Sequence, residues 1–251
     1  MIQASKFFSG DGTITAVSNT LKAVNKEYTS LAVRGQDVAV VATYKIIPNQ
    51  LINQHSVKHL FHITPRIGCV AIGSMPDCRS IVQRARVEAI RFEQRYGYSI
   101  PASALSKRIA GILQVCTQAM ELRMQACALI LVAYDDEKKQ PVVFEITPNG
   151  EHSSCWATSF GKHKAEADKQ LTASLFPAGA KSVQNFFNTE ETVKIAINCL
   201  KKIAGTEFNS RYVEIGVIGN DKNFETFKIL SAEDIKVYVS EDVTPMDTTK
   251  D

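Results

Sequence analysis

The 251-residue sequence has no apolar run long enough to cross a bilayer. Its longest uncharged apolar stretch, residues 124–134, is about half of the roughly 20 residues that a spanning helix needs. The N-terminus lacks the basic start and apolar segment of a secretion signal, and no Asn-x-Ser/Thr acceptor for N-glycans occurs. These absences argue against a membrane protein and against a secreted one.

Paired cysteines are also missing. The six cysteines are scattered, and the closest two, Cys69 and Cys78, are nine residues apart, so no Cys-x-x-Cys pair of a zinc or redox site occurs. Most of them lie in apolar runs, where a thiol packs as a small hydrophobic side chain. This usage is typical of a reducing compartment. We therefore expect a protein of the cytoplasm and nucleus with no cofactor.

An excess of charge of one sign is absent as well. Lys and Arg number 29 and Asp and Glu 26, which gives a formal net charge of +3, too mild to indicate a nucleic-acid or membrane-surface partner. The composition is 45% hydrophobic and 22% charged, which suffices for a packed core. No low-complexity linker divides the chain. We interpret residues 1–240 as one domain and expect the acidic and polar tail, residues 241–251, to be disordered.

The apolar patterns that are present predict antiparallel strands and helices in separate blocks, because tight turns join neighbouring strands. One such turn is Gly35-Gln36-Asp37, and a helix starting at Asn188 has a side chain that can cap its first amides. Periodicity alone therefore predicts an α+β fold. Strands are expected at residues 30–34, 38–43, 67–72, 127–134, 141–147, 155–160, 212–219 and 224–230, and helices at 20–28, from 77 to a break at 97–101, and at 105–120, 162–175, 188–204 and 232–239.

Buried positions follow from the same periodicity. The single tryptophan, Trp156, is expected in the core. The face predicted to be buried on the first long helix comprises Ile81, Val82, Ala85, Ala89, Ile90 and Phe92, and that on the second comprises Leu105, Ile109, Ile112, Leu113, Cys116 and Met120.

Three histidines have a spacing that could place two imidazoles on one helical face. The β-forming residues around them predict a strand instead. On a strand, His55 and His59 would lie about 13 Å apart at roughly 3.3 Å per residue, too far for one metal ion. We therefore expect His55, His59 and His62 to be surface or interface side chains.

No other pattern makes an enzyme site. The chain has no Gly-x-Ser-x-Gly nucleophile elbow, and residues 10–12 predict a turn without the lysine of a phosphate loop. Arginines make the first long helix basic, but Glu88 and Glu93 compensate them. A solvated or subunit-contacting face is therefore favoured over a nucleic-acid-binding module.

Many short strings of this sequence, taken in order, resemble the proteasome 20S alpha-subunit family, most of all its alpha type-6 members at the first position of the alpha ring. The coverage runs from about residue 7 to residue 236. The strings are Phe8-Ser9 with Gly12, residues 29–35, 59–64 and 67–70, Gly73 with Asp77 and Arg79, and residues 83–89, 96–101, 107–110, 114–118, 157–158 and 214–217.

The resemblance implies a four-layer αββα sandwich, in which two antiparallel sheets lie between helical layers, as in Ntn hydrolases. It further implies a non-catalytic subunit of a heteroheptameric ring, in a eukaryotic core particle of 28 alpha and beta subunits. Such a subunit contributes to ring assembly, to the axial gate and to the docking of regulatory particles in ubiquitin-dependent and other protein degradation. Nucleic acid, membrane and cofactor are not implied.

The family also bears on catalysis. In the related beta subunits, the nucleophile is an N-terminal threonine whose own amine acts as the base. Thr29 lies near the equivalent strand start, but 28 residues precede it, and Tyr28 stands where a self-processing site would have glycine. We expect no catalytic residue, and the alternative is a stand-alone Ntn-type hydrolase that uses Thr29 after processing.

The resemblance places a gate segment at about residues 1–18. The family's Phe-Ser-Pro-Glu-Gly is here Phe8, Ser9, Gly10, Asp11 and Gly12, so the turn proline is missing, and the family's Tyr-Asp-Arg falls on residues 1–3. A family pocket holds activator tails through a lysine that pairs with their terminal carboxylate. The matching pocket positions are His59, a weaker and pH-dependent partner, and Gly73.

Overall fold

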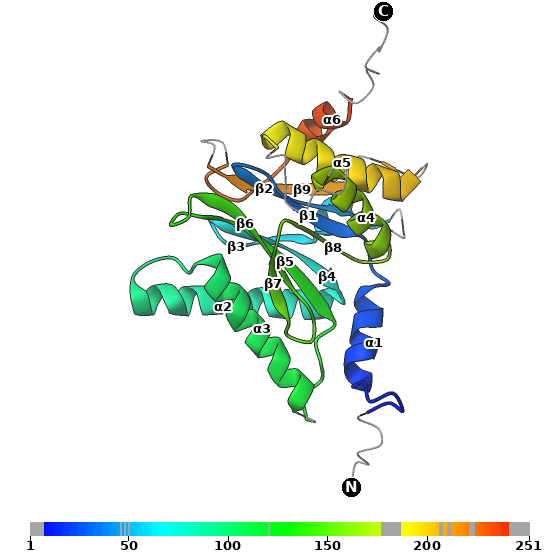
Figure 1. Ribbon diagram of the computed structural model, residues 1–251, viewed down its shortest axis with the longest axis vertical. Coiled ribbons are helices and arrows are strands. Elements are labelled where there is room, and N and C mark those ends of the chain that lie inside the picture. The colour runs from blue at the N-terminus through cyan, green and yellow to red at the C-terminus, as the bar shows by residue number, and fades with distance from the viewer. Residues whose placement is uncertain are drawn as a thin grey trace, which may run out of the picture.

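Two antiparallel sheets pack face to face between two layers of helices in the computed structural model (Figure 1). The structure describes residues 8–45, 47, 49, 51–119, 121–176, 187–205, 208–209, 212–220 and 224–240. The expected tail at 241–251, the first part of the gate segment at 1–7 and the predicted core residue Met120 lie outside these ranges. The α+β class and the four-layer order expected from the resemblance are both confirmed.

The first sheet has the strand order β10-β9-β2-β1-β8. The hairpin of β1 and β2 forms at the predicted residues, with Arg34 paired to Ala39 across the Gly35 turn. Strand β9 comes from late in the chain and pairs along the whole of β2. The bounds are β1 (Ser30–Arg34), β2 (Val38–Tyr44), β8 (Ala157–Phe160), β9 (Val213–Gly219) and β10 (Lys228–Ile229).

The second sheet has the order β3-β4-β5-β6-β7, so that each strand pairs with the next one along the chain. Its central hairpin of β5 and β6 surrounds the charged turn between Asp135 and Gln140. The bounds are β3 (Leu60–Thr64), β4 (Ile67–Gly73), β5 (Cys127–Asp135), β6 (Gln140–Ile146) and β7 (His152–Cys155).

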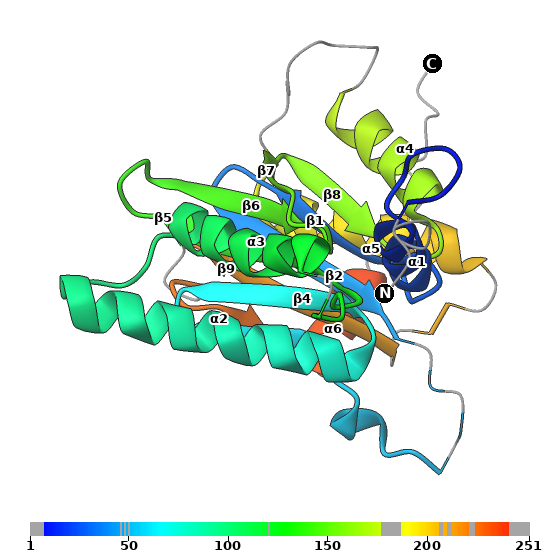
Figure 2. The same ribbon diagram turned by 90° about the horizontal axis from the view of Figure 1, so that it is seen from below.

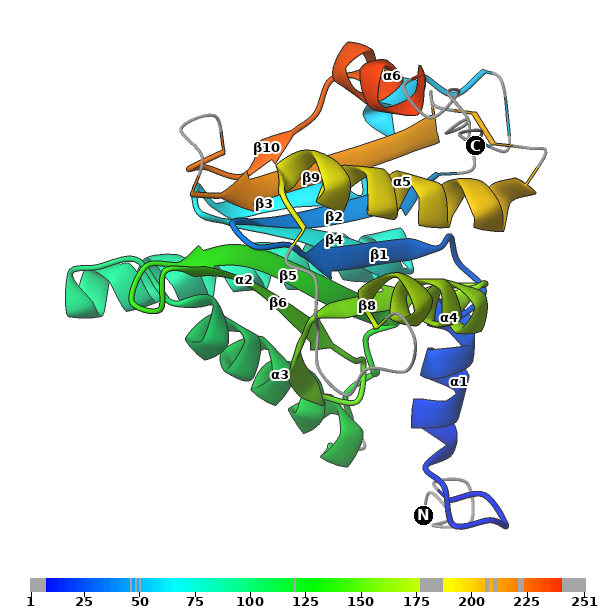
Figure 3. The same cartoon turned by 45° about the horizontal axis from the view of Figure 1, so that its top comes forward.

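The helices form one layer on each side of the sandwich. Helices α2 and α3 cover the second sheet, whereas α4, α5 and α6 cover the first (Figures 1 and 3). The cap predicted at Asn188 is present, and the structure shows it to be a capping box: the Asn188 side chain accepts the Glu191 N–H, and the Glu191 carboxylate accepts the Asn188 N–H. The bounds are α1 (Thr15–Val24), α2 (Met75–Tyr96), α3 (Ala102–Gln118), α4 (Lys164–Leu175), α5 (Thr189–Ala204) and α6 (Ala232–Ser240).

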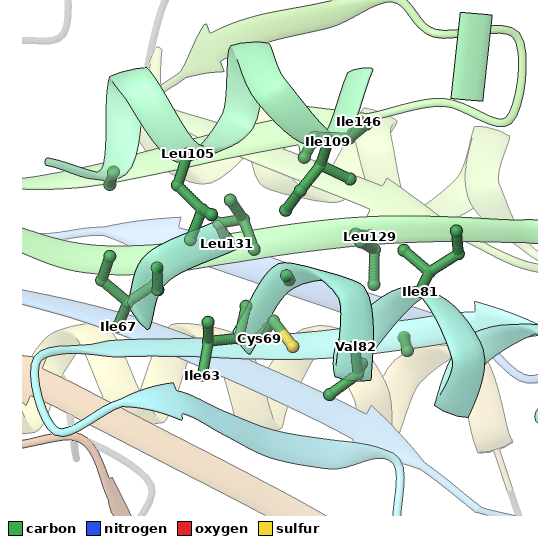
Figure 4. Close-up of a cluster of buried hydrophobic side chains, with 14 of the residues drawn as sticks. Ile63, Ile67, Cys69, Ile81, Val82, Leu105, Ile109, Leu129, Leu131 and Ile146 are labelled. Atoms are coloured by element: carbon green, nitrogen blue, oxygen red, sulfur yellow. The ribbon is translucent and has the colours of Figure 1, made fainter. Parts of the chain in front are cut away.

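Three buried clusters of side chains join the four layers. Successive residues of a strand point to opposite faces, so Val40 of β2 packs against helices while its neighbour Val41 packs between the sheets. The side chains of strand β5 alternate in the same way. Leu131 faces helices α2 and α3 (Figure 4), and Ile130 faces the other sheet. Both faces of the central strands are therefore buried, which explains their almost unbroken apolar sequences.

Some predicted elements are wrong in position. The helix expected at residues 20–28 is α1 at Thr15–Val24, because the chain must leave the helix to enter β1 as an extended strand. The strand expected at 155–160 is two strands, β7 and β8, which belong to different sheets and are separated by Trp156. The strand expected at 224–230 is reduced to the two residues of β10.

Two predicted core residues are exposed. Ile90 lies on the outer side of α2 and is 54% exposed, although its neighbours in the predicted stripe are buried. Trp156 is 39% exposed because it lies between β7 and β8, where the chain passes from one sheet to the other. The Arg34 guanidinium lies 4.3 Å from the centre of its ring.

Candidate functional site

The connection between α1 and β1 carries Thr29, the residue at the position of a possible nucleophile. Its side chain is buried, and its Oγ1 accepts the backbone N–H of His163 at 3.3 Å. The described chain continues without a break through Tyr28 into Thr29, so the nitrogen of Thr29 is an amide and cannot act as a base. Thr29 ties the start of β1 to the turn that precedes α4, which is a structural role.

A cavity of about 390 Å³ opens beside Thr29. The histidine in its wall, His163, has Nδ1 3.2 Å from a carboxylate oxygen of Glu166. The group of His163 that bonds the Thr29 hydroxyl is its backbone N–H, which cannot act as a base. It is lined by residues of the α1–β1 connection, β2, the β8–α4 turn and the end of α5: Lys26, Glu27, Tyr28, Thr29, Tyr44, Lys162, His163, Leu200, Ile203 and Ala204.

Three of the six cysteines are poor candidates for a nucleophile. Burial raises the pKa of Cys69 to about 12 and the pKa values of Cys155 and Cys199 to about 11. Because the thiolate is the reactive form, these side chains remain protonated and inert near neutral pH. Within the described ranges, no three His, Cys, Asp or Glu side chains gather as a metal site would require.

His59, the position of the expected activator pocket, is buried, and the prediction of a surface or interface side chain is wrong for this residue. Strand β3 begins only at Leu60, and the Tyr28 ring packs edge-on against the imidazole with the ring centres 4.6 Å apart. The Nε2 atom of His59 is buried without a hydrogen-bond partner among the described residues. Burial lowers the pKa of His59, an effect that Glu214 opposes and Lys45 reinforces, so the imidazole is neutral at pH 7.

The other two histidines belong to different elements of the backbone. The backbone of His55 belongs to a short 3-10 turn, η2 (Gln54–Ser56), which precedes β3, so the two residues do not share a strand. His62 is exposed on β3, with its ring 5.0 Å from that of Phe227. The imidazoles of His59 and His62 therefore pack against different aromatic rings.

Lys45 and Glu214 form an ion pair directly behind His59. The Lys45 Nζ donates to Glu214 Oε1 at 3.0 Å and to the carbonyl oxygens of Gln54 and Val57 at 3.1 Å, which uses all three of its protons. The other carboxylate oxygen of Glu214 accepts the backbone N–H of His59 at 3.0 Å. Both charges are thus partnered, as burial requires.

Gly73, the second expected pocket position, lies at the same end of the second sheet as His59. The Ala71 N–H donates to the His59 carbonyl, and Gly73 is two residues further along β4. Gly73 has φ +128°, and a Cβ there would clash with the carbonyl oxygen of Ala126. A glycine is therefore required here by the backbone itself.

The described part of the expected gate segment is a tight turn ahead of α1. The Ser9 N–H donates to the Thr13 carbonyl at 2.8 Å, the two side-chain hydroxyls are 2.7 Å apart, and Gly12 has φ +76°. Phe8 pairs with Ile14 as an isolated bridge and is 53% exposed. The turn predicted at residues 10–12 is confirmed, and it closes without the family's proline.

The basic helix α2 is tied to its surroundings. The Glu88 carboxylate forms ion pairs with Nη1 of Arg91, at 3.0 Å, and with Nη1 of Arg108 in α3, at 3.1 Å. The Arg86 side chain donates to the His62 carbonyl oxygen. These contacts hold Arg86, Arg91 and Arg108 against the protein, and the solvated or subunit-contacting face stays a prediction. Over the described ranges, no helix combines the length and apolarity that crossing a bilayer demands.

The sequence analysis missed the pair of Lys45 and Glu214. A signal for it exists, because Lys45 ends the apolar run of β2 and Glu214 is the only charged residue of β9. A single charge in a strand that is otherwise buried demands a partner. Which partner it finds depends on β2 and β9 being neighbours, which local sequence patterns do not reveal.

Comparison with known proteins agrees with this fold. The profile of the family described as "Proteasome subunit" matches residues 24–218. The chain is 38% identical to the probable proteasome subunit alpha type-1 of Schizosaccharomyces pombe over 92% of both chains. It is 31% identical to proteasome subunit alpha type-6 of Caenorhabditis elegans over 93% of this chain and 92% of that one. It is also 30% identical to the proteasome subunit alpha of Methanosarcina thermophila, over 95% and 92%.

The matches span nearly the whole chain, and the two-sheet fold agrees with them. Thr29, as an internal residue, has the hydroxyl but not the amine of a threonine peptidase. The chain therefore belongs to the proteasome subunit family, as a member of its non-catalytic alpha type.

Proposed function

We propose that this chain occupies the first position of the alpha ring in a eukaryotic 20S proteasome core. There it would contact two alpha neighbours and beta subunits in a particle of 28 chains. The subunit would template assembly of the ring, contribute to the axial gate and support the docking of regulatory particles. The similarity to alpha type-6 and type-1 subunits of eukaryotes supports this position.

The main support for the proposal is the environment of Thr29. The peptidase-like fold is complete, yet helix α1 and the turn at Ser9 precede the threonine, and its hydroxyl is bonded to the His163 amide. Such a chain retains the shape needed to pack into a ring but lacks the chemistry of cleavage. The alternative of a stand-alone hydrolase would require removal of α1, whose Val24 is buried between the sheets.

For the gate, we propose that residues 8–12 form a fixed base from which the preceding residues extend toward the axis. The backbone bonds of Ser9 with Thr13 and Gly12 support this role because they replace the missing proline. The segment, residues 1–18, has no tyrosine and no proline, and its one aspartate, Asp11, lies in the turn rather than at residues 1–3, where the family has Tyr-Asp-Arg. Gate order at this subunit would then depend on its neighbours.

For activator docking, we propose that the site at His59 and Gly73 contributes weakly. A neutral, buried imidazole lacks the positive charge that would pair with a terminal carboxylate. We also propose localisation in the cytoplasm and nucleus, where thiols stay reduced. All six cysteines lie in the described ranges and are free, which supports that setting.

A gentle pull-down of the tagged chain from its own cells, followed by native mass spectrometry and a peptidase assay, tests the proposal. We expect a particle of several hundred kilodaltons that contains other alpha-type and beta-type chains and cleaves peptides through an inhibitor-sensitive threonine. A monomer or small oligomer without such partners would contradict ring membership. Peptidase activity of the isolated chain would instead favour the hydrolase.

A further inference from the structure

The ring of Tyr28 covers the imidazole of His59. The two ring centres lie 4.6 Å apart in an edge-on arrangement, and only 2% of His59 is exposed. Tyr28 itself is half-buried and directly precedes Thr29, in the connection that joins α1 to β1. Tyr28 is therefore part of the cover that keeps His59 away from solvent.

The covered imidazole has an unused hydrogen-bonding atom. Its Nε2 is buried and has no partner within the described part of the chain, which is costly for a polar atom. The backbone of His59 is fixed, because its N–H donates to Glu214 at 3.0 Å and its carbonyl accepts the Ala71 N–H at 3.1 Å. A rigid backbone thus presents an imidazole whose free nitrogen a ligand could satisfy.

The charges around this pair of rings favour an anion. Lys58 directly precedes His59, and Lys26 and Lys162 line the cavity beside Thr29. All three lysines are exposed and have no carboxylate partner among the described residues. Glu27 is the one acid that the structure describes in the cavity wall. An excess of unpaired cations raises the local concentration of negatively charged ligands.

Tyr28 has a second place that its ring could occupy. It lines the cavity of about 390 Å³ beside Thr29, whereas His59 is not part of that wall. The wall includes the apolar side chains of Leu200 and Ile203 from α5, and Figure 2 shows α1 and α5 at the same end of the sandwich. The Tyr28 hydroxyl makes no hydrogen bond with a described residue, so packing alone holds the ring. A change of rotamer could therefore carry the ring from His59 into the cavity.

We propose that Tyr28 is a lid over a binding position at His59 for the terminal carboxylate of a regulatory-particle chain. In the closed state, which the structure shows, the ring occupies the place of the ligand. In the open state, the ring lies in the cavity, and the neutral imidazole, with its proton on Nε2, donates a hydrogen bond to the carboxylate. This inference rests on the proposed function and names the residue that closes the weak activator site of this subunit.

Modification of histidines by diethyl pyrocarbonate in the assembled particle tests the lid. The reagent acylates accessible neutral imidazoles, and mass spectrometry of the digest gives the rate at each histidine. We expect His59 to react about tenfold faster in Tyr28→Ala than in the wild type, because the aromatic contact is lost. Tyr28→Phe keeps the ring and should match the wild type. The exposed His62 is the internal reference and should react at the same rate in all three.

A second measurement tests the carboxylate. N-acetyl-trialanine with a free C-terminus is added to Tyr28→Ala particles, and the same peptide with a C-terminal amide serves as the control. We expect the free acid to slow the modification of His59, about twofold when half of the sites are occupied, and the amide to leave it unchanged. Because the readout is at His59, binding of the peptide elsewhere on the particle does not contribute to it.

A third variant tests where the ring goes when the lid opens. Ala204 of α5 lines the cavity, and Ala204→Phe fills part of it. With less room for the open state, Tyr28 should shield His59 more completely, so we expect the rate of His59 modification to fall below that of the wild type. Lys202→Phe, at an exposed position of α5 outside the cavity wall, is the matched control and should not change the rate.

Equal rates at His59 in the wild type and Tyr28→Ala, equal effects of the acid and the amide, or an unchanged rate in Ala204→Phe would overturn the lid and leave ring membership standing. A parallel rise at His62 would show that Tyr28→Ala unfolds, and Tyr28→Leu, which keeps apolar bulk without a ring, then replaces it. If the wild-type chain purifies without alpha-type and beta-type partners, the proposed function fails, and the same assay on the free chain still shows whether Tyr28 covers His59.

Discussion

Lys45 and Glu214 lie at the ends of two strands far apart in the sequence and form a buried ion pair with 3.0 Å between Nζ and Oε1. Strands β2 and β9 bring them together, since Thr43 is paired with Glu214 and Tyr44 with Val213. The pair fixes the register at the end of β2 and anchors the connection that leads to β3.

Substitution of Lys45 by Met should destabilise the protein by about 3–5 kcal/mol, because Glu214 would be left as an uncompensated buried charge. Urea unfolding at neutral pH measures the effect. The matched control is Arg66→Met, which removes the exposed ion pair with Asp136 and should cost at most about 1 kcal/mol. Equal losses for the two variants would show that the buried pair has no special role.

Gly73→Ala should be more harmful than Gly97→Ala. Both glycines have positive φ, but a Cβ at Gly73 meets the Ala126 carbonyl, whereas one at Gly97 meets nothing within 4 Å. We expect a loss of about 1 kcal/mol at Gly97, from backbone strain alone, and at least about twice that at Gly73. Unfolding free energies of the two variants provide the comparison, and similar values would contradict the steric argument.

Thr29→Ala should leave the peptidase activity of the assembled particle unchanged. The substitution should lower the stability of the chain by about 1 kcal/mol, because the His163 N–H loses its acceptor. Thr29→Ser keeps the hydroxyl and should retain most of that stability. Loss of peptide cleavage in Thr29→Ala particles of normal composition would revive a catalytic role.

The stability contributed by Asp77 should depend on pH. Hydrogen bonds from Arg123 are the largest cause that lowers the pKa of Asp77, and the Ala126 N–H adds to them. A lowered pKa stabilises the folded state above the unfolded pKa of about 3.9, and the contribution disappears as the pH falls through the folded value.

Asp77→Asn should therefore cost about 1–2 kcal/mol at pH 7, and its deficit relative to wild type should shrink below about pH 4. Urea unfolding from pH 7 to pH 3 measures this difference. Asp136→Asn, at an exposed ion pair, is the control and should differ from wild type by at most about 0.5 kcal/mol throughout. A deficit for Asp77→Asn that is constant with pH would rule out the carboxylate charge as its source.

Local sequence patterns predict the strands and helices whose burial follows one simple pattern along their whole length. Strands β2 and β5 follow from their apolar runs, and α5 follows from its stripe and from the Asn188 cap. The split at Trp156 could not be predicted, because the residues on both sides are β-formers and only the tertiary structure sends them to different sheets.

The site was less predictable than the fold. Residues 55–63 look like one strand with exposed histidines, yet His59 is buried because β3 begins after it and Tyr28 covers its ring. Its neutral state depends on burial and on Lys45, which directly follows β2. Contacts between distant segments determine these properties, so no window of sequence around His59 contains them.

The place of β9 in the first sheet has a consequence for synthesis. Strand β9 lies between β2 and β10, so β2 has a neighbour on one side only until Val213–Gly219 has been translated. Helix α5, which covers the same sheet, is also a late segment. For most of its time on the ribosome, the growing chain thus presents an apolar strand edge and an uncovered sheet face. Such surfaces favour aggregation and call for a chaperone until the final part of the chain emerges.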